Sequence, residues 1–328
     1  MLALSICALP AVGSADVNVY SYRQPFLIES VFDAFTAQTG IKVNTVFAKK
    51  GLVERLKNEG RNSPADLLLT TDSGPLYQAV NEGLTQALGN STLEQNIPEE
   101  FRDPEGHWFG LTSRARLIVA SKERIDTDTI KDYEDLARPE FANMVCTRSG
   151  KHTYMVALNA SIIAHHGIEN ATGWLEGVKN NLARKPQGND RAQVKAIQQG
   201  ECDIAIINSY YMGQMLADEE QIPWAESVNV IFPNQSNRGT HMNISGASLT
   251  SGAPNRDDAI KLLEFMSSDT AQKIYAETNH EYPVKAGVEP SALVQSWGEF
   301  KGDTLPLAKI AEHRASAVKL ADKVGYDQ

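Results

Sequence analysis

The sequence predicts an α/β protein of two lobes. Strand and helix patterns alternate through residues 17–83, an order typical of a parallel sheet covered on both faces. A long apolar strand at 110–121 interrupts that order, and a second set of strands and helices follows it. The 328 residues suffice for two domains, and no long flexible linker divides them. We therefore expect the lobes to be joined by strands that cross from one to the other.

The first lobe begins with a short strand at residues 17–20, whose polarity alternates as in a half-buried strand. The helix expected at 26–38 repeats Leu27, Val31 and Phe35 at four-residue spacing, which places them on one face. The same criteria predict strands at 41–47 and 66–70 and helices at 51–59 and 74–82.

The second half of the chain contains a further set of elements. We expect strands at 144–147, 203–207 and 228–232, an apolar segment at 242–249, and helices at 155–166, 172–181, 191–199, 255–266, 269–278 and 307–324. The chain should enter the second lobe near Ser113 and return near Asn243. We assign residues 16–112 and 245–285 to the N-terminal lobe and residues 113–244 and 286–328 to the C-terminal lobe.

The charge balance excludes one class of partner. A formal net charge of −10 and a pI near 5.3 argue against nucleic-acid binding, because the basic surplus that neutralises phosphates is missing. The sequence also lacks a P-loop, a dinucleotide-binding glycine pattern and the nucleophile elbow of serine hydrolases. Nothing in the residues specifies an enzyme. An acidic protein can meet small cations, although its charge can also serve solubility alone.

The N-terminus predicts export. Residues 1–12 are apolar and uncharged, and the small residues 13–15 follow as a cleavage site would require, so we assign 1–15 to a signal peptide. A buried N-terminal strand or helix is the alternative. No other apolar stretch approaches the roughly 20 residues needed to span a bilayer. The mature protein is expected to be soluble and exported.

Two cysteines remain after the predicted cleavage, Cys146 and Cys202. Each precedes a segment that contains tyrosine, and neither has the spacing of a metal or redox motif. In an oxidising compartment the two thiols can pair, and a disulfide would tie together two strands that lead to the tyrosines. Two separate buried thiols are the alternative.

Tyrosines occur where predicted strands give way to helices. Tyr210 and Tyr211 follow one strand, Tyr154 lies in a loop that leads into a helix, and Tyr22 lies at the end of the first strand. In an open α/β sheet, ligands bind at this edge. Phenolate oxygen is a hard donor that suits Fe(III), whereas zinc is mostly bound by cysteine, histidine and carboxylates.

A structural interpretation remains open for each of these residues. A single tyrosine is more often amphipathic, with its ring in the core and its hydroxyl at the surface. Arg114 and Arg116 alternate on a strand and share one face, from which one of them could hold an anion or pair with a phenolate. A surface ion pair is the alternative. Free amides at 148–150 could hold a small anion such as carbonate.

Several segments together resemble the periplasmic ferric-iron-binding proteins of ABC importers. The matching segments are VNVYSYRQ at 17–24, TGIKVN at 39–44, GLVERLKNEGRNSPADLLLTTD at 51–72, GLTSRARLIVAS at 110–121, CDIAIINSYY at 202–211, NRGTHMNISGA at 237–247 and EYPV at 281–284. They occur in one order and extend over nearly the whole mature length. Several matches in order are more specific than any single motif.

The resemblance implies a two-lobed periplasmic-binding-protein fold, in which each lobe is a mixed, mostly parallel sheet flanked by helices. It implies a monomeric, non-catalytic protein that takes Fe(III) between its lobes and delivers it to an inner-membrane ABC permease. The family's tyrosine pair corresponds to Tyr210 and Tyr211, and its further second-lobe tyrosine corresponds to Tyr154. The arginine beside the family's metal corresponds to Arg114, which offsets phenolate charge or holds a synergistic anion such as carbonate.

One part of the family's site is replaced in this chain. Many members have a His-Tyr pair after the first strand, where this sequence has Gln24 and Pro25. Tyr22 is the only nearby phenol that could substitute, as a metal ligand or as a wall of the cleft; otherwise water or a small anion fills the open positions. Two other functions stay open: a binding protein of the same fold for an organic solute or anion, and a secreted enzyme with a tyrosine acid or base.

Overall fold

The computed structural model describes residues 16–328, and the predicted signal peptide at 1–15 lies outside this part of the chain. The strands are β1 (Val17–Ser21), β2 (Val43–Phe47), β3 (Leu67–Thr70), β4 (Phe109–Ser121), β5 (Val145–Cys146), β6 (Ile204–Asn208), β7 (Val228–Ile231), β8 (Met242–Leu249) and β9 (Tyr282–Pro283). They form one mixed sheet in the order β2-β1-β3-β8-β4-β6-β5, and both β7 and β9 pair with β4.

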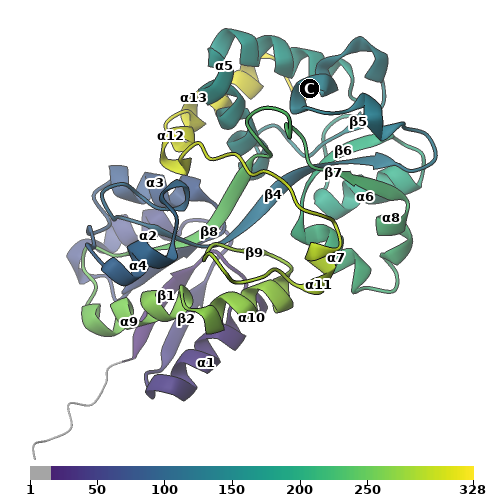
Figure 1. Ribbon diagram of the computed structural model, residues 1–328. Helices are drawn as coiled ribbons and strands as arrows, with labels where there is room; N and C mark the ends of the chain where they lie inside the picture. The colour runs from purple at the N-terminus through teal and green to yellow at the C-terminus, as the bar shows by residue number, and fades with distance from the viewer. Residues whose placement is uncertain (1–15) are drawn as a thin grey trace, which may run out of the picture.

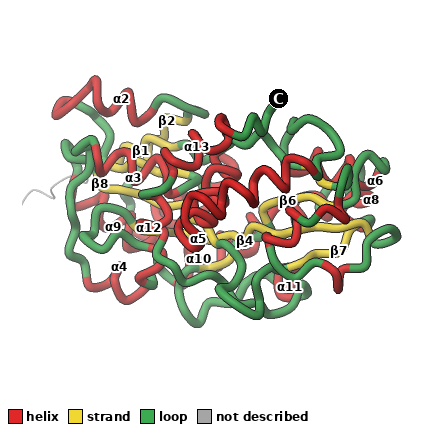
Figure 2. Tube along the Cα trace, turned by 90° about the horizontal axis from the view of Figure 1, so that it is seen from above, coloured by secondary structure: helices red, strands yellow, loops and turns green. Residues whose placement is uncertain are grey.

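The helices cover both lobes (Figures 1 and 2). They are α1 (Glu29–Thr39), α2 (Leu52–Glu59), α3 (Ser73–Asn81), α4 (Ser91–Asn96), α5 (Thr153–Asn180), α6 (Asp190–Gln198), α7 (Tyr210–Leu216), α8 (Ile222–Glu226), α9 (Arg256–Met266), α10 (Asp269–Asn279), α11 (Ala292–Gln295), α12 (Leu307–Ala311) and α13 (Arg314–Lys323).

Strands β4 and β8 connect the lobes, and Figure 1 shows them running side by side from one lobe to the other. Strand β4 pairs antiparallel with two strands: residues 109–115 pair with β8, and residues 116–120 pair with β6. All 13 residues of β4 are buried, because other elements cover the strand along its whole length. The predicted α/β class with two lobes and strand crossovers is thus confirmed. The residue boundaries that we gave to the lobes stay a prediction.

Four predicted helices differ from the structure. The helix expected at 26–38 is a short 3-10 helix, Pro25–Leu27, followed by α1, because Ile28 leaves helical geometry with a φ of −133°. The helices expected at 155–166 and 172–181 are the two parts of α5, which breaks at Gly167 where φ is 78°. The helix expected at 307–324 is two helices, α12 and α13, separated by a turn.

That last break lets the C-terminal segment contact both lobes. Helix α13 packs along α5, whereas α12 contacts both α5 and α3. Leu307 and Ile310 of α12 belong to the same buried apolar cluster as Leu76 of α3. The apolar periodicity of residues 307–324 continues through the turn between α12 and α13, so it did not reveal the break.

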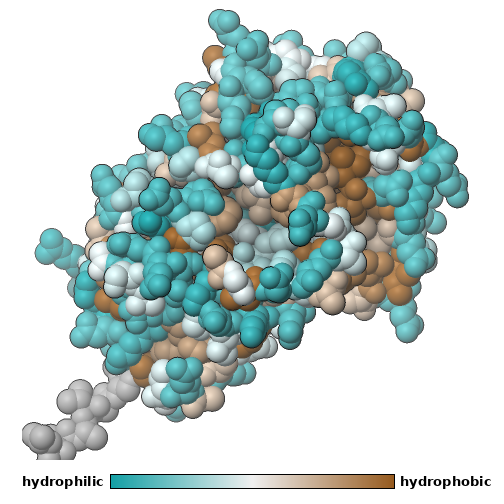
Figure 3. Space-filling view, viewed as in Figure 1, coloured by the Kyte–Doolittle hydropathy of each residue, from teal (hydrophilic) through white to brown (hydrophobic). Residues whose placement is uncertain are grey.

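Of the two alternatives for the cysteines, the structure has the disulfide, between Cys146 in β5 and Cys202 just before β6, with their Cα atoms 6.0 Å apart. The disulfide links the parallel neighbouring strands β5 and β6, whose carboxyl ends lead toward the predicted site. Within residues 16–328, no helix has the length and apolar character that a membrane crossing requires. The face seen in Figure 3 is mostly hydrophilic and is hollowed between the lobes.

Candidate metal site

A cavity of about 510 Å³ lies between the lobes. The four predicted tyrosines and Arg114 all contribute to its wall, although they come from separate segments of the chain. The first lobe contributes Tyr22 among others, the second contributes the other three tyrosines, and Arg114 comes from the crossing strand β4. The structure therefore brings together every residue that we predicted for the site.

Two of the phenols are in direct contact. The hydroxyl oxygens of Tyr154 and Tyr210 lie 3.0 Å apart, and the Asn208 side-chain amide donates to the Tyr210 hydroxyl at 3.4 Å. Tyr210 and Tyr211 are the first two residues of α7, and their ring centroids are 4.4 Å apart. The three second-lobe tyrosines thus form one cluster, as their common position at strand-to-helix junctions predicts.

A histidine fixes the start of the helix that carries Tyr154. His152 is the N-cap of α5, and its Nδ1 accepts a hydrogen bond from the Tyr154 backbone amide at 3.2 Å. Its ring also packs edge-on against the Tyr154 ring, with centroids 4.6 Å apart. Burial and the nearby Arg148 guanidinium lower the pKa of His152 to about 4, so the ring is neutral at pH 7 and can accept this bond.

The cluster by itself favours the neutral form of its phenols. Burial is the main cause that raises the pKa of Tyr154 and of Tyr210, and the nearby Tyr211 phenol raises both further, although the hydrogen bond with Tyr210 lowers the pKa of Tyr154. Arg114 acts in the opposite direction on both residues. A strongly charged cation would therefore have to displace protons from these hydroxyls before phenolates could form.

Three guanidinium groups surround the ring of Tyr154. Arg114, Arg116 and Arg148 lie 5.6, 5.7 and 5.1 Å from its centroid. Arg114 keeps its Nε and Nη1 free of hydrogen-bond partners within the described part of the chain. These cations favour negative charge on the phenol cluster and leave one donor group available for an anion.

Asp190 anchors two of those arginines and the end of β6. This fully buried carboxylate accepts from Arg116 Nη1 at 2.6 Å, from Arg148 Nη1 at 3.1 Å and from the Asn208 backbone amide at 2.8 Å. It thereby connects β4, the loop before α5 and the strand that leads into α7. The segments carrying Tyr154 and Tyr210 are held in one frame as a result.

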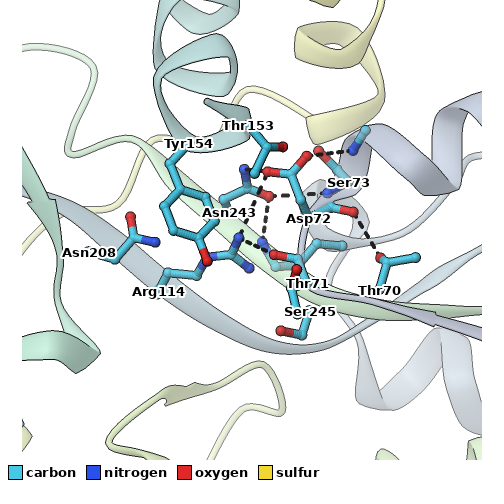
Figure 4. A network of polar contacts seen from close by, with 12 residues as sticks. Thr70, Thr71, Asp72, Ser73, Arg114, Thr153, Tyr154, Asn208, Asn243 and Ser245 are labelled. Atoms are coloured by element: carbon cyan, nitrogen blue, oxygen red, sulfur yellow. Dashed lines mark hydrogen bonds and ion pairs between the residues drawn. The ribbon is translucent and has the colours of Figure 1, made fainter. Parts of the chain in front are cut away.

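Asp72 provides a similar anchor from the first lobe (Figure 4). It accepts from the Asn243 side-chain amide at 2.9 Å, pairs with Arg314 at 2.9 Å and lies 3.9 Å from Arg114. Arg114 also donates to the Thr71 carbonyl. The guanidinium that faces Tyr154 is thus held by the loop between β3 and α3, on the opposite lobe.

Tyr22 reaches the cavity with its hydroxyl already engaged. The oxygen accepts from the backbone amides of Leu52 and Val53, at 2.8 and 3.0 Å, which are the first two residues of α2. Burial raises the pKa of Tyr22 and outweighs these two donors, which lower it. As observed, the residue is a wall of the cavity; its role as a ligand stays a prediction.

Part of the segment at 148–150 is already occupied by a carboxylate. The Ser149 hydroxyl and the Gly150 amide both donate to the Asp327 side chain, at 2.8 and 2.9 Å. The expectation of a free amide is therefore wrong for Gly150, and for the rest of the segment it stays a prediction. That contact was not predictable, since Asp327 is 177 residues away in sequence from Gly150.

Sequence reasoning also missed Arg191 and His280, which both line the cavity. Arg191 makes no ion pair or hydrogen bond through its side chain with the residues described here, and no motif distinguishes it in the sequence. Among residues 16–328, no group of three or more His, Cys, Asp or Glu side chains could hold a metal ion.

Comparisons with known proteins agree with this architecture. Residues 62–297 match the family model for bacterial extracellular solute-binding proteins. The chain is similar to iron uptake protein A1 of Synechocystis sp., with 44% identity over 314 residues that cover 95% of this chain and 87% of that protein.

Two solved structures are similar over almost their whole length. Ferric iron-binding protein A of Mannheimia haemolytica, in an open conformation, has 53% identity and a TM-score of 0.90, with 96% of this chain and 99% of that one covered. The Trichodesmium protein IdiA (FutA), in complex with iron and citrate, has 42% identity and a TM-score of 0.91, with 95% and 99% covered.

Proposed function

The chain belongs to the bacterial extracellular solute-binding proteins, and from that membership we propose that it captures Fe(III) between its lobes through tyrosine phenolates. The observation that carries the proposal is the contact of Tyr154 with Tyr210 in a cavity that also contains Tyr211. The names of the Synechocystis, Mannheimia and Trichodesmium relatives, which refer to iron uptake or ferric iron, support the same cation.

Tyr154, Tyr210 and Tyr211 serve as the protein ligands. Phenolates are hard donors. A trivalent ion binds them more strongly than a divalent ion does, so it better offsets the free-energy cost of deprotonating buried phenols. Within the described residues, no cluster of softer or carboxylate ligands competes for the ion. Tyr22 forms the cavity wall, and it would have to leave the start of α2 to become a ligand.

A charge count supports a bound anion beside the metal. Around the cluster, Arg114 and Arg314 share Asp72, Arg116 and Arg148 share Asp190, and Arg191 lines the cavity, so these cations outnumber the two carboxylates. Three phenolates would neutralise a trivalent ion and leave this excess in place. A dianion such as carbonate would offset part of it, with Arg114 as the donor.

Export and delivery complete the proposal. We assign the protein to the periplasm as a monomer that passes iron to an inner-membrane ABC permease, with cleft opening as the releasing step. The relatives named above are binding and uptake proteins by name, and we propose a binding role rather than catalysis.

A larger cargo is the second candidate. The cavity of about 510 Å³ exceeds what a bare ion needs, and Arg191 offers it a cation that has no ion-pair partner among residues 16–328. Both observations favour an organic carboxylate, alone or together with iron. Aromatic stacking or carboxylate clamps would then determine affinity, and the phenols would stay protonated.

Metal selectivity tests the proposal. Dialysis against ferric citrate, ferrous salt or zinc, followed by gel filtration and metal analysis, should leave a single Fe(III) per chain and little zinc. Tyr77 lies in a different groove, so Tyr77→Phe is the matched control and should bind iron like wild type. Retention of citrate without iron would favour the second candidate instead.

A further inference from the structure

A histidine of the first lobe lies directly on the helix that carries the tyrosine pair. His280 ends α10, a helix that packs against α1, and α10 contacts α7 of the second lobe. A Cβ atom placed on Gly213 of α7 would lie 2.4 Å from both Cγ and Cδ2 of the His280 ring. The ring therefore occupies the space that any larger residue at 213 would need.

Glycine at position 213 is not explained by the local helical structure. Glycine is a poor helix former, and α7 has only seven residues, so local propensity does not account for it. The residue is buried and lies three positions after Tyr210, which places both on one face of the helix. The absent side chain creates a notch, and the His280 ring fills it.

His280 is held firmly by its own lobe. Its backbone is left-handed, with φ of 55°, and the following residue, Glu281, forms a buried ion pair with Arg23. On the other side, the Asn279 amide donates to the Leu27 carbonyl at 3.0 Å. The Cβ of His280 would itself lie 2.7 Å from a Cβ added to Gly213, so a rotation of the ring would not relieve a clash.

We propose that the His280–Gly213 contact is the point through which the first lobe positions the tyrosine pair and limits cleft opening. The contact is independent of the proposed iron function. Its expected consequence, slow release of iron, rests on that function. The contact is between a first-lobe residue and the second-lobe helix that begins with Tyr210 and Tyr211. His280 acts as a positioning residue because it touches α7.

The cavity geometry agrees with this assignment. His280, Tyr210 and Tyr211 line the same cavity, so separating His280 from α7 widens the cavity at the tyrosine pair. Iron held by three second-lobe phenolates would then meet solvent and competing chelators. Its release rate should depend on a contact that includes no metal ligand.

Release kinetics test the proposal. The iron-loaded protein is mixed with excess EDTA, and loss of visible absorbance is followed. Gly213→Ala should release iron about tenfold faster or more, because overpacking pushes the lobes apart. Gly173→Ala is the matched control, since a Cβ on this helical glycine of α5 meets nothing within 4 Å.

Two further variants separate packing from ring chemistry. His280→Ala should also speed release, and His280→Phe should restore most of the slow rate if the ring fills the notch. The double variant Gly213→Ala with His280→Ala should match His280→Ala alone, because the clash has then been removed. If His280→Phe releases iron as fast as His280→Ala, the packing role is overturned.

Small-angle scattering of the metal-free chain gives a readout that does not need iron. Gly213→Ala should have a larger radius of gyration than wild type, with unchanged far-ultraviolet circular dichroism as evidence of folding. An unchanged radius, together with an unchanged release rate, would overturn the positioning contact. If the radius grows and wild type takes up no iron, the proposed function fails while the contact stands.

Discussion

The hydroxyl oxygens of Tyr154 and Tyr210 lie 3.0 Å apart, although the two residues stand near the starts of different helices. Their helices follow β5 and β6, which are parallel neighbours in the sheet. The carboxyl ends of parallel neighbours meet at one edge, so residues just beyond them come together. The phenol cluster therefore follows from the sheet topology, and its chemistry makes several testable predictions.

Iron uptake should release protons. Because burial raises the pKa of Tyr154 and Tyr210, these phenols keep their protons at pH 7 until the ion binds. About three protons should be released per ion, so affinity falls as the pH decreases. A pH-stat titration with ferric citrate measures this number. Tyr154→Phe should release about one proton fewer, and an unchanged number would exclude Tyr154 as a phenolate ligand.

Tyr22→Phe distinguishes a cavity wall from a ligand. The variant loses the oxygen that accepts from the amides of Leu52 and Val53, so stability should fall by about 1 kcal/mol. The visible spectrum of the iron-loaded protein should stay unchanged. Urea unfolding and absorption spectra measure the two effects. A shifted or weakened band would instead assign Tyr22 to the metal.

Asp190→Asn should destabilise the second lobe strongly. The buried carboxylate forms ion pairs with both Arg116 and Arg148, and removing one partner of a buried ion pair costs about 3–5 kcal/mol. Urea unfolding measures the loss. Lys309→Ala, which breaks an exposed pair with Glu312, should leave stability unchanged. Equal midpoints for the two variants would mean that Asp190 does not anchor the site.

Reduction of the Cys146–Cys202 disulfide should lower stability without removing iron. The bond closes a loop with a sequence separation of 56 residues, and such links contribute about 2–4 kcal/mol. Thermal unfolding with and without dithiothreitol measures the change, and the double serine variant is the control. Because dithiothreitol can itself reduce Fe(III), the iron spectrum is compared in the double serine variant without reductant, and its loss there would show that the disulfide shapes the site directly.

Local pattern and topology made much of this site predictable. The sequence shows that Tyr154 and Tyr210 each follow the end of a strand, because strand periodicity is a local signal. Ligands of open α/β sheets bind at the edge where strands end, so this position indicates a site. The pairing of the two remaining cysteines was an open alternative that the structure decides in favour of the disulfide.

Long-range contacts were not predictable in the same way. Asp72 lies beside Arg114 in a loop of the other lobe, and Asp327 occupies the Gly150 amide, which the sequence had left as a possible anion donor. Neither contact has a local signature, since the partners are distant in sequence. The contact at Gly213 was equally unpredictable. The sequence shows a glycine in a helix, but only the structure shows that the His280 ring packs against it.

The central claim, that phenolates of the tyrosine pair hold Fe(III), is tested most directly by visible spectroscopy. Ferric citrate added to the metal-free protein should produce a phenolate-to-iron charge-transfer band that saturates at a single ion per chain. Tyr77→Phe should keep the band, and the double variant Tyr210→Phe with Tyr211→Phe should lose it. A band that persists in the double variant, or that never forms in wild type, would contradict the account.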